Sequence, residues 1–135
     1  VHSSILYQLV CNELLARHDY PGHIQGLITR YRDKARLMTD AMEQHFHPGI
    51  TFHKPEGGFF IMAWLPEGHD SLPFVQEAIK RRVITVPGSA FMADTSAPHN
   101  GIRINFSLPS AEDIAPGIRT LGQLSHQWLG GLRAV

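Results

Sequence analysis

The stretch Gly101-Ile102-Arg103-Ile104-Asn105-Phe106-Ser107 alternates apolar and polar side chains. This period of two predicts a β-strand, with a core face formed by Ile102, Ile104 and Phe106 and a polar face formed by Arg103, Asn105 and Ser107. An arginine on a strand anchored by packing holds a planar set of donors that matches a carboxylate or a phosphate. The stretch therefore favours a site for an anionic ligand, although a strand arginine on a polar face is also commonly a solvated surface residue.

Composition narrows the class of protein. The 135 residues, 43% of them hydrophobic, are enough for one compact domain. Twelve Lys and Arg residues balance twelve Asp and Glu residues, so neither nucleic acid nor an anionic membrane is an expected partner. No secretory signal and no apolar run of about 18 residues is present. The single cysteine, Cys11, cannot form an internal disulfide, and we expect a buried thiol in a reducing, cytoplasmic setting.

The histidines raise the question of a metal site. His45 and His47, followed by His53, could form a cluster of ligands. No cysteine accompanies them, and the first two lie where a helix is expected to end before Pro48-Gly49, where histidine interacts favourably with the helix dipole. We therefore expect no metal site.

The first third of the chain has helical periodicity. Apolar residues recur through residues 1–18, and the segment Asp19-Tyr20-Pro21-Gly22 predicts a break. From Ile24 onward apolar residues return in steps of four and three until Pro48-Gly49, which predicts a long amphipathic helix. Its charged residues, Lys34 among them, are expected to form a solvated face.

The remainder alternates strands and helices. The apolar run over residues 59–65 predicts a buried strand, and residues 83–86 predict a second, short one. Between them a helix is expected, capped by Asp70 or Ser71. Ser110 begins a capping-box pattern for a final helix, and its apolar stripe of Ile114, Ile118 and Leu121 is expected to pack against the core face of the 101–107 strand. Pro116 suggests that the regular helix starts nearer Gly117. The pattern predicts one α+β domain.

Three motifs in order carry a family resemblance: Lys54-Pro55-Glu56-Gly57-Gly58-Phe59-Phe60, Val86-Pro87-Gly88-Ser89-Ala90-Phe91 and Arg103-Ile104-Asn105-Phe106-Ser107. They resemble the C-terminal small domain of pyridoxal-phosphate aminotransferases of fold type I, within the class I/II branch that includes the 2-aminoadipate and aromatic enzymes. The resemblance covers nearly the whole chain. It implies a small mixed or antiparallel sheet covered by helices. Residues 1–135 would be one C-terminal domain, with a helical linking segment over 1–47 and the α+β part over 48–135.

The resemblance also implies a function. Arg103 would bind the α-carboxylate of the substrate, with Asn105 beside it, in a cytoplasmic, homodimeric enzyme that moves an amino group between an amino acid and a 2-oxo acid. The family needs a lysine that forms a Schiff base with pyridoxal phosphate, and Lys34, Lys54 and Lys80 all lie in surface contexts. We therefore expect the cofactor to be bound mainly by a larger upstream domain, and this chain alone to be inactive. No catalytic, cofactor-binding or metal-binding residue is assigned within it.

Two other functions stay open. An aminotransferase-like domain fused to an N-terminal winged helix would make the protein a transcription regulator that senses an amino acid or pyridoxal phosphate, and an upstream winged-helix sequence would identify it. The retained Pro55-Glu56-Gly57-Gly58-Phe59-Phe60 element favours the enzyme. A helix-rich interaction module without a ligand is the other alternative, but it would leave the strand arginine without a purpose. Which amino acid is the substrate is not readable from these residues.

Overall fold

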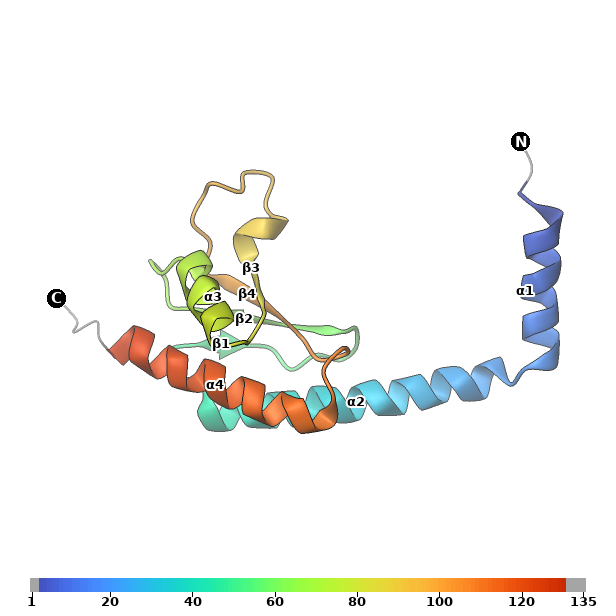
Figure 1. Ribbon diagram of the computed structural model, residues 1–135, viewed down its shortest axis with the longest axis horizontal. Coiled ribbons are helices and arrows are strands. Elements are labelled where there is room, and N and C mark those ends of the chain that lie inside the picture. The colour runs from blue at the N-terminus through green and yellow to red at the C-terminus, as the bar shows by residue number, and fades with distance from the viewer. Residues whose placement is uncertain (1–2, 131–135) are drawn as a thin grey trace.

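A computed structural model describes residues 3–130, as helices packed on a small sheet (Figure 1). The four strands lie in the order β1-β2-β4-β3, and every neighbouring pair is antiparallel. The predicted α+β fold is therefore confirmed. In chain order the elements are α1 (Ile5–Arg17), α2 (Tyr20–His45), β1 (Thr51–Phe52), β2 (Phe60–Trp64), α3 (Ser71–Lys80), β3 (Val86–Pro87), the 3-10 helix η1 (Gly88–Phe91), β4 (Gly101–Asn105) and α4 (Ala111–Gly130).

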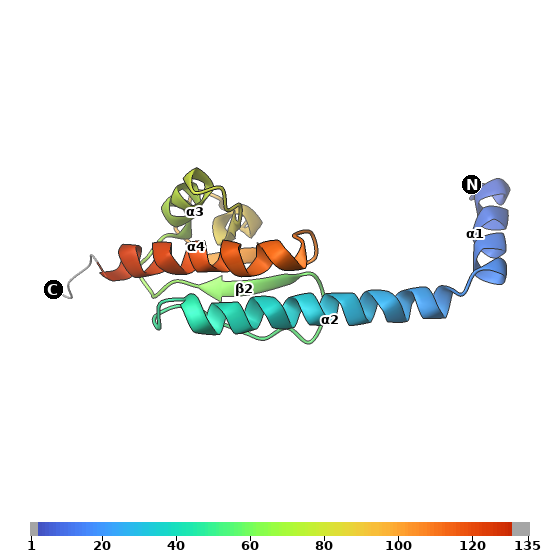
Figure 2. The same cartoon turned by 60° about the horizontal axis from the view of Figure 1, so that its bottom comes forward.

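One face of the sheet forms the core. Ile61 of β2 lies opposite Ile104 of β4, and both side chains are buried. The helices α2 and α4 lie side by side across this face of the sheet (Figure 2). The apolar residues of β4 and the stripe of α4 join one buried cluster, as predicted, because period two and period 3.6 each direct one set of side chains inward. This cluster includes Ile102, Ile104, Phe106, Ile114, Ile118 and Leu121.

The helices α2 and α4 approach each other closely at Gly122. A Cβ atom added to Gly122 would lie 2.4 Å from the carbonyl oxygen of His45, so only glycine fits there. The fully buried Ser125 fastens the same crossing. Its hydroxyl accepts a hydrogen bond from the His47 N–H at 2.9 Å and donates one to the Gly122 carbonyl at 2.6 Å.

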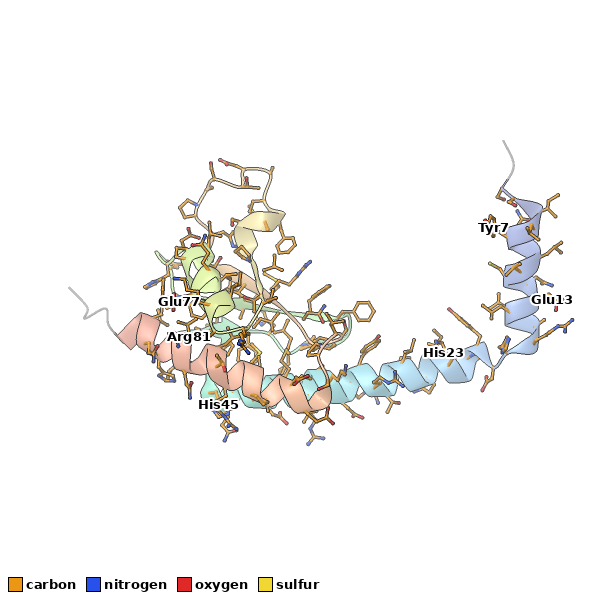
Figure 3. All side chains as sticks on the ribbon, in the orientation of Figure 1. Tyr7, Glu13, His23, His45, Glu77 and Arg81 are labelled. Atoms are coloured by element: carbon orange, nitrogen blue, oxygen red, sulfur yellow. The ribbon has the colours of Figure 1, made fainter. Side chains whose placement is uncertain are left out.

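The helix α1 stands apart from the sheet. None of its residues is buried, and Tyr7 and Glu13 extend into open space (Figure 3). Cys11 is exposed, so the prediction of a buried thiol is wrong. The apolar stripe was correctly placed on a helix, but no other part of the described chain covers it. No helix within residues 3–130 has the length and apolar content to cross a membrane.

The predicted break at residues 19–22 is shorter than expected. The helix α2 already begins at Tyr20, because the Asp19 side chain accepts a hydrogen bond from the Gly22 N–H at 3.0 Å and caps it. Pro21 is tolerated in the first turn, where a backbone N–H would have no helical partner.

The strands are also shorter than predicted. The run over residues 59–65 is a strand only from Phe60 to Trp64, and it is buried on one face, since Phe59 is 48% exposed and Phe60 39% exposed. The expected strand at residues 83–86 shrinks to Val86–Pro87, and Ile84 is 82% exposed. In both places apolar composition overstated burial.

Helix ends follow their caps. Asp70 caps α3 by accepting a hydrogen bond from the Leu72 N–H at 3.1 Å, which selects one of the two predicted caps. The helix α4 begins at Ala111, not near Gly117, with Ser110 accepting from the Asp113 N–H at 3.2 Å. Pro116 lies inside the helix on its exposed side, where water can hydrogen-bond the carbonyl that the missing N–H leaves free.

Candidate functional site

Arg103 lies on the side of the sheet opposite the helical layer. Its neighbours Ile102 and Ile104 are buried, whereas Arg103 is only half-buried, as the alternation in β4 requires. It is flanked across the sheet by Met62 of β2 and Val86 of β3. A central strand with a partner on each side therefore fixes its backbone.

Two aromatic rings hold the guanidinium group. The guanidinium carbon of Arg103 lies 4.2 Å from the ring centre of Phe60 and 4.2 Å from that of Phe91. These distances are typical of cation–π contacts. The Nε atom is enclosed and has no hydrogen-bond partner within the described residues. Nor does any carboxylate between residues 3 and 130 form an ion pair with Arg103.

Asn105, two residues further along the strand, shapes the turn that follows. Its Oδ1 atom accepts hydrogen bonds from the Ser107 hydroxyl at 3.0 Å and from the Leu108 N–H at 2.9 Å. A backbone N–H can only donate, which fixes the orientation of the amide. The amide Nδ2 is then the atom of Asn105 that remains for a ligand.

The 3-10 helix η1 carries Phe91 to its place beside Arg103. The backbone of Gly88 packs against the ring of His99, since a Cβ on Gly88 would lie 2.1 Å from His99 Nδ1. His99 Nδ1 accepts a hydrogen bond from the Gly101 N–H at 2.9 Å, and the Ser71 hydroxyl donates to the His99 carbonyl at 2.6 Å. These contacts tie η1 to the start of β4 and to α3.

The three lysines all have partners. Lys34 is half-buried, and its Nζ donates to the carbonyls of Ser107 at 2.9 Å and Pro109 at 2.6 Å. Its assignment to a solvated face is therefore wrong, because it joins α2 to the turn after β4. Lys54 forms a 2.7 Å ion pair with Glu43, and this hydrogen bond raises the pKa of Lys54.

Lys80 pairs with Glu77 at 2.9 Å on the exposed side of α3, near the helix end. The hydrogen bond from Lys80 lowers the pKa of the Glu77 carboxyl. Each of the three ammonium groups thus already has oxygen partners within the described residues.

The histidines do not converge on a common point. His47 Nδ1 accepts a hydrogen bond from the Gly49 N–H at 3.0 Å, and its ring meets that of His126 edge to face. The ring of His53 packs on Trp64. In the part of the chain that the structure describes, no group of three or more His, Cys, Asp or Glu residues could hold a metal ion.

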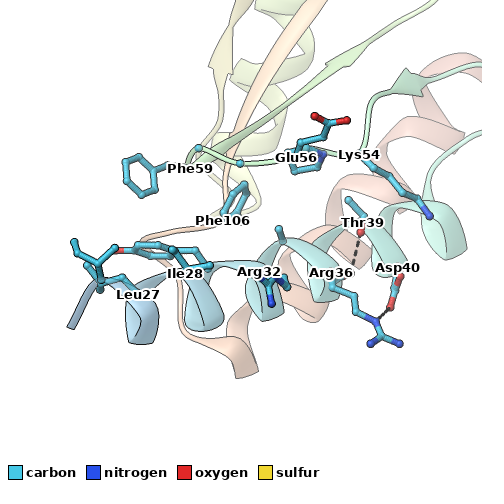
Figure 4. A pocket seen from close by; sticks show the side chains of 16 residues that line it. Leu27, Ile28, Arg32, Arg36, Thr39, Asp40, Lys54, Glu56, Phe59 and Phe106 are labelled. Atoms are coloured by element: carbon cyan, nitrogen blue, oxygen red, sulfur yellow. Dashed lines mark hydrogen bonds and ion pairs between the residues drawn. The ribbon is translucent and has the colours of Figure 1, made fainter. Parts of the chain in front are cut away.

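A cleft of about 760 Å³ lies between α2 and the loop over residues 54–59 (Figure 4). Tyr31 and Phe59 meet edge to face at its wall, with ring centres 5.1 Å apart, and Phe106 lies at its floor. Arg103 is not among the lining residues, because the cleft is on the helical side of the sheet. In the loop, Gly58 has a φ of +81°, the conformation that favours glycine.

Sequence reasoning found Arg103 but missed the residues around it. Phe91 is 49% exposed, and its ring contacts the guanidinium. Ser89 is buried within η1, which has no side-chain cap hydrogen bond. The fold brings Phe60 and Phe91 to the same guanidinium from positions 31 residues apart. Strand pairing could have identified only Phe60, because it pairs with Asn105 and is therefore the diagonal neighbour of Arg103.

Comparison with known proteins gives consistent relatives. No protein-family model matches the chain. An uncharacterized aminotransferase of Saccharolobus solfataricus is 36% identical over 128 residues, which are 94% of this chain and 32% of that protein. Aromatic-amino-acid aminotransferase 1 of Thermococcus litoralis is 37% identical over 101 residues, covering 75% of this chain and 24% of that protein.

Solved structures agree with these relatives. The crystal structure of LysN, an alpha-aminoadipate aminotransferase of Thermus thermophilus complexed with N-(5'-phosphopyridoxyl)-L-leucine, superposes with a TM-score of 0.84 and 27% identity. The match covers 97% of this chain and 33% of that chain. The chain thus spans about a third, or less, of the length of these relatives.

A regulator is also among the relatives. An uncharacterized HTH-type transcriptional regulator of Escherichia coli is 25% identical over 120 residues, which are 89% of this chain and 25% of that protein. The two aminotransferases named above match at higher identity, 36% and 37% against 25%. The chain belongs to the fold type I aminotransferases, of whose length it represents about a third, and its fold is that of their C-terminal domain.

Proposed function

We propose that residues 1–135 form the C-terminal domain of a pyridoxal-phosphate-dependent aminotransferase that moves an amino group between an amino acid and a 2-oxo acid. In this proposal Arg103 binds the α-carboxylate of the substrate. The main support for this proposal is the environment of the Arg103 guanidinium. It lies against two aromatic rings and forms no ion pair with any carboxylate in the described residues.

A charged group that is half-buried without a counter-ion is costly unless something compensates it. Cation–π contacts compensate part of this cost, and a bidentate carboxylate would compensate much more. The relatives at 36% and 37% identity are aminotransferases, and the second is named for aromatic amino acids, which carry such a carboxylate. An anionic substrate is thus the ligand that the Arg103 environment fits best.

Asn105 is proposed as a second substrate-binding residue. Its Oδ1 atom is occupied by the turn at residues 107–108, so its contribution to binding would come from Nδ2 as a donor. It lies on the same face of β4 as Arg103, two residues along the strand. Both donors would then approach one anion from the same side of the sheet.

The lysines do not fit the aldehyde of pyridoxal phosphate, since each ammonium group is held by carboxylate or carbonyl oxygens. When bound, the cofactor supplies the electron sink of the reaction. We therefore assign its binding to residues outside this chain and expect the chain alone to be inactive as a transaminase. A homodimeric, cytoplasmic parent protein is proposed on the family resemblance alone.

The test compares Arg103 variants of the longer protein on α-amino acids and on the matched decarboxylated amines. We expect Arg103→Ala to weaken kcat/KM for the amino acid by roughly 2–5 kcal/mol, with cofactor binding near normal. Arg103→Lys should recover only part, because an ammonium cannot reproduce the planar fork. Arg30→Ala, an exposed change on α2, is the control. An equal proportional loss for amino acid and amine would rule out carboxylate binding.

The regulator relative supports a second candidate, in which the same domain senses an amino acid. Arg103 would bind the same anionic group, but the readout would be DNA binding and no amino group would be transferred. The longer protein should then bind a promoter fragment in a way that depends on the amino acid, with loss of that dependence in Arg103→Ala. Transamination without DNA binding would exclude this candidate.

A further inference from the structure

We propose that Phe60 and Phe91 are positioning residues that fix the guanidinium of Arg103 before an anion arrives, and that they thereby set the affinity for the substrate carboxylate. This inference rests on the proposed function, because it concerns how the carboxylate arginine is oriented. It is drawn from the two equal contacts of 4.2 Å between the guanidinium carbon and the ring centres.

The contacts come from both neighbours of the central strand. Phe60 pairs with Asn105 in the register of β2 and β4, so Arg103 is its diagonal neighbour on the same face. Phe91 reaches the group from η1, which follows the strand on the other side of β4. The guanidinium therefore lies between side chains of two elements that the sheet holds in place.

The rings replace hydrogen bonds as the means of orientation. Among residues 3–130 the Arg103 side chain has no ion-pair partner, and its enclosed Nε atom has no hydrogen-bond partner. A free arginine side chain has about 2 kcal/mol of rotamer entropy to lose on binding. Ring contacts restrict it without occupying the in-plane donors of the terminal nitrogens, so a carboxylate meets an arginine that is already ordered.

The exposure of the rings is consistent with this role. Phe60 is 39% exposed and Phe91 49% exposed, so neither is a core residue. Gly88 and His99 hold the backbone of η1 through a contact that leaves no space for a Cβ. The position of Phe91 is thus built by packing at a site where the ring itself adds little to the core.

The kinetic test uses single leucine and tyrosine variants of Phe60 and Phe91 in the longer protein. Leucine keeps apolar area but removes the ring face, whereas tyrosine retains it. We expect each leucine variant to raise the KM for the α-amino acid roughly 3–20-fold and to change the KM for the decarboxylated amine little. The tyrosine variant at the same position should keep the KM for the amino acid near that of the unchanged protein. Phe59→Leu, whose ring contacts Tyr31 instead, is the matched control.

A double-mutant cycle separates positioning from stability. In the Arg103→Ala background, Phe91→Leu should not raise the KM for the amino acid any further, because the guanidinium that Phe91 positions is gone. A direct readout is the NMR signal of the Arg103 Nε–H, which two ring faces should shift upfield and which Phe91→Leu should move back. Gly88→Ala, which displaces η1, should reproduce the Phe91→Leu phenotype.

The outcomes distinguish this inference from the proposed function. If Arg103→Ala discriminates amino acid from amine but the leucine variants behave like Phe59→Leu, the function stands and the ring contacts have no positioning role. An additive loss in the double mutant, or an Arg103 Nε–H signal without a ring-current shift, also contradicts the inference. If Arg103→Ala weakens the reaction of the amino acid and of the amine equally, the proposed function and this inference are both wrong.

Discussion

Two glycines of α4 should respond to the same substitution with opposite signs. Gly122 lies where α4 crosses α2, and a Cβ added there would be 2.4 Å from the carbonyl oxygen of His45. Gly117 lies in the same helix, and a Cβ added there meets nothing within 4 Å. The pair therefore separates helix propensity from interhelical packing.

The magnitudes follow from the two environments. Alanine in a helix is favoured over glycine by about 1 kcal/mol, and Gly117→Ala should gain roughly 0.5–1 kcal/mol. At Gly122 the new Cβ would be about 1 Å closer to a backbone atom than an ordinary contact allows, so the helices must move apart. Overpacking of this kind costs about 1–3 kcal/mol, and the buried hydrogen bond between Ser125 and the His47 N–H would weaken as well.

We therefore expect Gly122→Ala to lower the free energy of unfolding by roughly 1–3 kcal/mol after the gain in propensity is included. Urea unfolding followed by tryptophan fluorescence, with Trp64 and Trp128 as reporters, measures both variants. An unchanged m-value would show that the effect is on stability and not on the extent of unfolding. If Gly122→Ala were as stable as Gly117→Ala, the close approach of α2 to α4 would be wrong.

Further substitutions test the core, a helix end and a turn by the same unfolding measurement. Phe106→Ala should cost about 3–5 kcal/mol because the side chain is 1% exposed, and a loss under about 1 kcal/mol would place it outside the core. Arg82→Gly should gain about 0.5–1 kcal/mol, since Arg82 has a φ of +63° after the end of α3, and a net loss would show that its side chain matters more than its backbone. Lys34→Met should cost about 1.5–3 kcal/mol through its two carbonyl partners, against less than about 0.5 kcal/mol for the exposed Lys80→Met, and equal effects would refute the buried role of Lys34.

Local periodicity predicted the fold well where an element has one buried face. The alternation around Arg103 predicted both faces of β4, and the stripe of α4 predicted the side that packs on the sheet. Capping residues predicted the start of α3, because a side-chain acceptor two residues from a free N–H acts locally. These features depend on residues that are close together in the sequence, so local patterns are enough to predict them.

The failures depend on distant partners. Cys11 was expected to be buried because it lies in an apolar helical stretch, but burial requires a covering surface that the described chain does not provide. Lys34 looked like one more charge on a polar helix face, yet carbonyls more than 70 residues away accept from it. Pro116 suggested that the final helix starts nearer Gly117, but its exposed position lets water replace the lost hydrogen bond. Periodicity cannot report such long-range contacts.

The site was predictable only in part for the same reason. Arg103 was evident because a strand with one apolar face makes a polar residue on the other face conspicuous. The ring of Phe91 was not, because its position depends on the packing of Gly88 against His99 and on the pairing of β3 with β4. The arginine belongs to a local pattern, whereas its environment belongs to the tertiary structure.

The alternation in β4 also shows how one strand can combine core packing with the ligand binding that we propose. Ile102 and Ile104 lie 3% and 5% exposed beneath the helices, so the packing energy of the strand is on that face. Arg103 lies between them on the other face and contributes no ion pair to the fold within the described residues. Because the two faces share only the backbone, the residue that we propose to bind the anion can be desolvated or replaced with little effect on the core. Core packing in turn holds that residue in place, which is the condition for rigid recognition of a carboxylate.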